Sequence, residues 1–159
     1  MARYLNTDKV SQALIALLTA ELPAKLTAIP AAERVISVIK TYGAGSPTWI
    51  KDNEFPTVRV NVRASARAGG IGRVIAPSFD AIVSVGFRDR ATTEAVQDGL
   101  RISDLCGQII MGHDCYTYGG ENVWRGLQRG TIAHQPAGSE RWQGGQWGCT
   151  LDADEVTWT

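Results

Sequence analysis

The chain has 159 residues and carries 16 basic and 16 acidic side chains, so its formal net charge is zero. A hydrophobic share of 44% with 20% charged residues is typical of a folded protein, and excludes a disordered or membrane-embedded chain. This length suits one domain, expected over residues 1–159, and zero net charge means that any electrostatic partner must be met locally.

The N-terminal segment "MARYLNTDKVSQALIALLTAEL" carries polar residues around an apolar stripe, which is unlike a signal peptide, and the sequence has no run of 18 apolar residues. The three cysteines have no C-x-x-C spacing, which is typical of a reducing compartment. We therefore expect synthesis in a cytoplasm and no membrane partner.

Thr7 or Asp8 can cap a first helix, and Pro23 either ends it or begins a continuation. Residues 26–42 are compatible with helix or strand, and we expect a short helical turn followed by a strand. Residues 41–56 are rich in turn formers and predict a connection, with Trp49 and Phe55 as anchors onto the core.

Two alternating segments follow, "TVRVNVRA" from Thr57 and "FDAIVSVGFRDR" from Phe79. In the first, Val58, Val60 and Val62 share one face and polar side chains the other. These segments predict two antiparallel strands joined by a long loop at about 64–78. Because such loops are commonly functional, we expect this one to be mobile in a free subunit and ordered on assembly.

A second helix is predicted over residues 91–112, with small residues at Ala95 and Gly99 that would let it lie close to a sheet. A short strand around 123–134, a turn at 135–140 and a final alternating strand from Arg141 complete the chain. The predicted fold is α+β: a mostly antiparallel sheet of about four to five strands covered by two helices, in a single domain.

The loop segment "RASARAGGIGRVIAPSF" invites comparison with phosphate-binding loops, but neither G-x-G-x-x-G nor a P-loop is present and a strand follows it. Four arginines occur between Phe55 and Phe79 with no acid among them: Arg59, Arg63, Arg67 and Arg73. They could contact nucleic-acid phosphates, yet no aromatic residue accompanies them, so a solvated hairpin tip remains the plainer interpretation.

His113 and Cys115 form the other chemical candidate. With His134 and Cys149 they could make a zinc site, but the spacing of paired ligands is missing, and a cysteine nucleophile would need a histidine brought beside it. Isolated His and Cys residues are more often packing or surface positions, so we expect no metal, no cofactor and no enzyme.

The C-terminal end is acidic and aromatic, with candidate contact residues Asp152, Asp154, Glu155 and Trp158. Opposite charges on the arginine-rich hairpin and this end would suit contacts between subunits or with a tube, although two unrelated solvated patches would look the same.

The organisation resembles that of tail terminator, or tail-completion, proteins of phages with long non-contractile tails. The pieces that carry it are the opening helix with "LTAELPAKL", the strand "FPTVRVNV", the long hairpin loop, the strand "FDAIVSVGFRDR", the helix "TTEAVQDGLRISDLCGQIIMG" and the closing "GSERWQGGQWGCTLDADEV".

The resemblance implies a non-enzymatic ring, expected to be a homohexamer, which stops polymerisation of the tail tube and offers a docking surface to the head. Its partners would be further copies of itself, the major tail tube protein and the head-tail connector, with DNA only passing through the lumen, and its location the virion. The alternatives are a head-completion or connector protein, a small nucleic-acid-binding module, and an enzyme using His113 and Cys115.

Overall fold

A computed structural model describes residues 7–30, 39–65, 78–88, 92–124, 126–128, 135–139 and 141–152. The predictions for 31–38, for the loop within 66–77 and for 153–159 lie outside the described residues. Within them the chain has two long helices, α1 (Thr7–Thr27) and α2 (Thr92–Met111), and a large sheet whose pairs are mostly antiparallel. The predicted α+β class is therefore confirmed.

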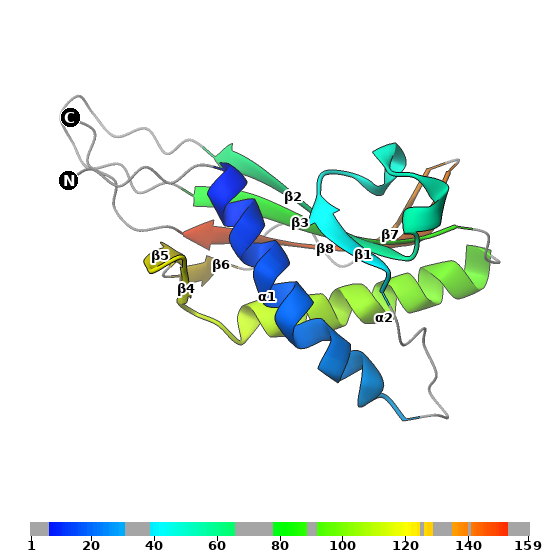
Figure 1. Ribbon diagram of the computed structural model, residues 1–159, viewed down its shortest axis with the longest axis horizontal. Coiled ribbons are helices and arrows are strands. Elements are labelled where there is room, and N and C mark those ends of the chain that lie inside the picture. The colour runs from blue at the N-terminus through cyan, green and yellow to red at the C-terminus, as the bar shows by residue number, and fades with distance from the viewer. Residues whose placement is uncertain are drawn as a thin grey trace.

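The large sheet has the order β1-β2-β3-β8-β6, and β7 also pairs with β8 (Figure 1). Its strands are β1 (Thr41–Ala44), β2 (Thr57–Ser65), β3 (Ser78–Phe87), β6 (Gly126–Gln128), β7 (Gln135–Gly138) and β8 (Gln143–Asp152). A second, two-stranded sheet joins β4 (Tyr116–Tyr118) to β5 (Glu121–Trp124). The β2–β3 hairpin is antiparallel, as expected.

Two details differ from the expectations. Thr41–Ala44 forms a parallel edge strand beside β2, and Gln135–Gly138 pairs with β8 instead of forming a turn, so the large sheet has six strands in the described part of the chain. Neither segment shows a clear alternation of apolar and polar side chains. An edge strand depends on backbone pairing with its neighbour, so its own sequence need not alternate. Of the two alternatives predicted at Pro23, the structure has the continuation: α1 runs on to Thr27, and Pro23 lies inside it and is exposed.

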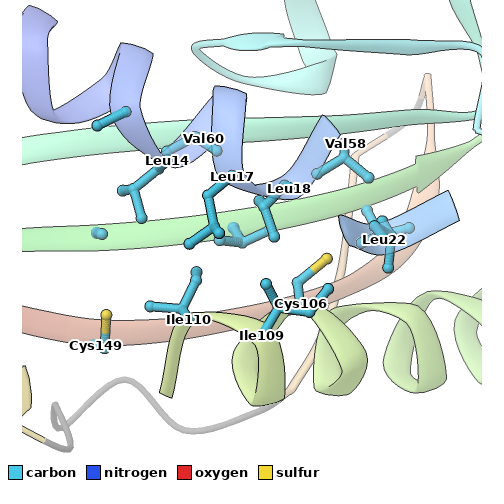
Figure 2. Packing of buried hydrophobic residues seen from close by; sticks show 14 of the residues in the cluster. Leu14, Leu17, Leu18, Leu22, Val58, Val60, Cys106, Ile109, Ile110 and Cys149 are labelled. Atoms are coloured by element: carbon cyan, nitrogen blue, oxygen red, sulfur yellow. The ribbon is translucent and has the colours of Figure 1, made fainter. Parts of the chain in front are cut away.

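One face of the sheet packs against both helices. The predicted inward residues of β2 and β3 lie on this face, and register places Cys149 and Leu151 of β8 beside them. In Figure 2 the leucines of α1 pack against β2 valines and against Cys106, Ile109 and Ile110 of α2. This face holds the main hydrophobic core.

The helix α2 lies unusually close to β8. A Cβ on Gly99 would overlap the backbones of Gly144 and Gly145, and one on Gly107 would lie 2.5 Å from the Trp147 indole. The predicted role of Gly99 in close packing is thus confirmed, and a matching pair of glycines in β8 makes the approach possible.

The opposite face, here called the open face, is mostly polar, and neither α1 nor α2 covers it. At one end the β1–β2 connection folds over it, where Gly86 leaves space for Pro47, Phe55 and Trp142. The predicted burial of Phe55 is confirmed, but Trp49 is 84% exposed, so its predicted role as a core anchor is wrong. Pro47 and Trp142 occupy the buried position over Gly86 instead.

Candidate interaction surfaces

The basic hairpin and the acidic C-terminal end begin at the same end of the sheet. Ser65 of β2 pairs with Ser78 of β3, which pairs with Asp152 of β8. The segment 66–77, with Arg67 and Arg73, and the segment 153–159, with Asp154, Glu155 and Trp158, therefore leave the described structure from adjacent strands. We call this the loop-and-tail end. Those five residues themselves lie outside the described residues.

The side chain of Arg59 is bound by other residues of the same chain. Its Nε donates to Thr57 Oγ1 at 3.0 Å and its Nη2 to Thr41 Oγ1 at 3.3 Å, while Nη2 lies 3.8 Å from Glu54 Oε1. Its guanidinium occupies the space above Gly43, and the side chain is 11% exposed. Arg59 thus connects β1 to β2. The alternation of side chains along β2 places it over the parallel edge strand β1.

Arg63 and Asp152 lie on the open face near the loop-and-tail end. Arg63 is 82% exposed, and its Nη2 is 3.8 Å from Asp80 Oδ2, a separation at which an exposed ion pair adds little stability. Asp80 also accepts from Thr150 Oγ1 at 2.9 Å, and Asp152 accepts from Ser78 Oγ at 3.0 Å. Arg63 is therefore the predicted contact residue that the described structure leaves most accessible.

A second surface feature is Trp49, which the sequence placed in the core. It ends a short 3-10 turn, Pro47–Trp49, capped by Ser46, whose Oγ accepts from the Thr48 amide. The Arg141 guanidinium donates to Thr48 O at 3.0 Å and to Ile50 O at 3.2 Å, the carbonyls on either side of Trp49. An exposed indole is therefore presented on a backbone that is fixed on both sides.

Further hydrogen bonds and an ion pair stabilise the same turn. Asp52 Oδ1 accepts from Arg141 Nη2 at 3.1 Å and lies 3.3 Å from Arg88 Nε, and the Trp142 indole donates to Thr48 Oγ1 at 3.1 Å. Little in the sequence indicates this arrangement, because Arg141 lies some ninety positions from Thr48 and Ile50, whose carbonyls it binds.

We expect Arg141→Ala to loosen the Trp49 turn while leaving the core folded. Loss of these partly exposed bonds should lower the free energy of unfolding by about 1 kcal/mol. Cleavage by a lysine-specific protease after the exposed Lys51 should become faster, whereas Arg63→Ala, which removes an arginine without such bonds, should leave that rate unchanged. Equal cleavage rates in Arg141→Ala and the parent would contradict the assigned role.

His113 lies beside an aromatic cluster at the end of α2. Its Nε2 is 2.8 Å from Glu21 Oε2, which joins α1 to the turn after α2. Its carbonyl accepts from the Trp124 indole at 2.8 Å, and Tyr116 stacks on Trp124 with centroids 4.9 Å apart. The hydrogen bonds of His113 thus link three elements of the fold.

The three cysteines differ in how far they are buried. Cys106 and Cys149 lie in the core, where burial raises the pKa of both thiols, that of Cys149 to about 12, while Cys115 is exposed. His134 lies outside the described residues, and among those described no three His, Cys, Asp or Glu side chains gather as metal ligands.

One thiol per chain should react with a maleimide in the native protein at mildly alkaline pH, and it should be Cys115. The nucleophile is the thiolate, and the raised pKa values keep Cys106 and Cys149 protonated as well as inaccessible. Mass spectrometry of intact protein should show one adduct before unfolding and three after it; a Cys115→Ser variant should show none before unfolding. Rapid labelling of Cys149 in the folded chain would count against its placement.

No helix in the described part of the chain has both the length and the apolar composition needed to cross a membrane. Neither a protein-family model nor a curated protein sequence matches the chain.

Proposed function

We propose that the chain is a structural subunit of a phage virion that forms a ring at the end of a tail tube. The ring would stop tube polymerisation and present a docking surface to the head. This rests on the resemblance in organisation and is supported by one observation: the loop-and-tail end, where two segments of opposite charge start on adjacent strands.

The position of the loop-and-tail end suggests how the segments would be used. Because both originate at one end of each subunit, they suit a contact along the ring axis, with the tube or the connector, better than a contact from one side of a subunit to the next. A ring contact joins two different surfaces of neighbouring copies. The basic and acidic segments would then recognise a surface that carries both signs of charge.

The test uses tubes assembled from the tail tube protein encoded nearest to this chain. Wild-type protein should bind tube ends and fix tube length in negative-stain images. The triple variant Arg63→Ser, Arg67→Ser, Arg73→Ser should lose most of this capping at physiological salt. Lys25→Ser, which removes an exposed charge from α1, should cap normally.

Normal capping by the triple variant would refute the role of the hairpin, and absence of wild-type protein from tube ends would refute the function. Binding to heads in place of tubes would indicate the connector alternative. Binding of duplex DNA that weakens steeply with salt and disappears in the triple variant would indicate a nucleic-acid-binding module.

A further inference from the structure

Two large apolar side chains of the described structure are exposed, Trp49 at 84% and Met111 at 39%. An exposed indole on a fixed backbone suits a contact anchor, because tryptophan buries a large area and little freedom remains to be lost on binding. Methionine is a good counterpart, since its flexible thioether packs favourably against aromatic rings.

These two residues lie toward opposite ends of the large sheet and on its opposite faces. The Trp49 turn covers the open face near Gly86, which pairs with Gly144 at the start of β8. The helix α2 crosses the other face, with Gly99 against Gly144 and Gly145 and Gly107 against Trp147 further along β8. Met111, the last residue of α2, therefore lies toward the far end of the sheet (Figure 1).

The surroundings of the two residues carry opposite charge. Among the described residues around the Trp49 turn, four cations (Lys51, Arg59, Arg88 and Arg141) face two carboxylates (Asp52 and Glu54), which leaves two positive charges.

Around Met111, Asp104 and Gln108 lie on the same face of α2, and Asp114 follows the helix end. The negative end of the helix dipole adds to these two carboxylates, while Arg101, the nearest cation on α2, lies about three turns before Met111.

We propose that Trp49 of one copy packs against Met111 of the next copy, with the basic rim of the Trp49 turn facing Asp104 and Asp114. The two surfaces are different, so a contact between them is heterologous and head-to-tail. Repetition of such a contact produces a ring if the rotation closes and a filament if it does not. The inference rests on the proposed function and deepens it by naming the subunit contact.

Cross-linking of purified protein tests the contact without any tube. Asn53 and Cys115 are exposed, the first close to Trp49 along the chain and the second close to Met111. An Asn53→Cys, Cys115→Ser variant mixed with wild-type chain at high concentration should give a covalent dimer with a short bismaleimide. Either protein alone should give little, because a head-to-tail contact does not bring two identical positions together.

Trp49→Ala added to the Asn53→Cys, Cys115→Ser variant should abolish the mixed product. In sedimentation velocity, the wild-type mass should rise with concentration, and Trp49→Ala or Met111→Glu should weaken association about 30-fold. Ala20→Glu, which adds the same charge to an exposed position on α1, should associate like wild type.

The inference is overturned if the mixed product is missing, if it survives Trp49→Ala, or if one protein alone cross-links equally well. Tube capping by a protein that fails these tests would leave the proposed function intact and remove only this contact. Head-to-tail association without tube capping would leave this contact intact and refute the proposed function.

Discussion

Replacement of Trp124 by alanine should lower the free energy of unfolding by about 3–5 kcal/mol, a large share of the 5–15 kcal/mol typical of a domain. Trp124 is completely buried, stacks on Tyr116 and donates its indole hydrogen to His113 O. Alanine removes the packing and the donor together. Thermal unfolding of the variant should therefore begin about 10 °C lower.

Two variants separate the contributions. Trp124→Phe keeps an aromatic ring in the site but leaves His113 O without the indole donor, and should cost about 1–2 kcal/mol. Trp49→Ala makes the same change at an 84% exposed position and should alter stability by less than about 0.5 kcal/mol in dilute protein. If Trp124→Ala were as mild as Trp49→Ala, the β4–β5 sheet would not be packed as described.

Gly99→Ala should destabilise the chain by about 1–2 kcal/mol, although alanine is the better helix former. The gain in helix propensity is about 1 kcal/mol. Against it, the added Cβ would overlap the backbones of Gly144 and Gly145, and backbone atoms of a central strand cannot move aside as a flexible side chain can. Overpacking of this kind typically costs 1–3 kcal/mol and here includes a forced separation of α2 from β8, so the loss should exceed the gain.

The control is Gly112→Ala at the other end of α2. A Cβ there would meet Gln108 O and Ile109 O at 3.4 Å, an ordinary contact, so its effect should be within about 0.5 kcal/mol. Urea unfolding of both variants measures the difference. A stabilised Gly99→Ala protein would show that α2 does not approach β8 as closely as the structure has it.

The candidate surfaces were only partly predictable. Alternation identified Arg63 as an outward residue and the structure leaves it accessible, but the same alternation put Arg59 on that face without revealing that β1 lies beside it. Trp49 lies in a connection rich in turn formers, and the sequence predicts it as an anchor of that connection onto the core. Its exposure depends on bonds from Arg141, which no local pattern can show.

Periodicity in the sequence by itself determined the two helices, the inward faces of β2, β3 and β8, the antiparallel hairpin and the α+β class, because spacing within one segment decides which side chains can be buried together. The tertiary structure alone decided the parallel edge strand β1, the pairing of β7, the end of the sheet at which the hairpin loop and the C-terminal segment begin, and the exposure of Trp49 and Met111. These depend on contacts between residues far apart in the chain, whose free energy is gained only when the whole sheet has formed.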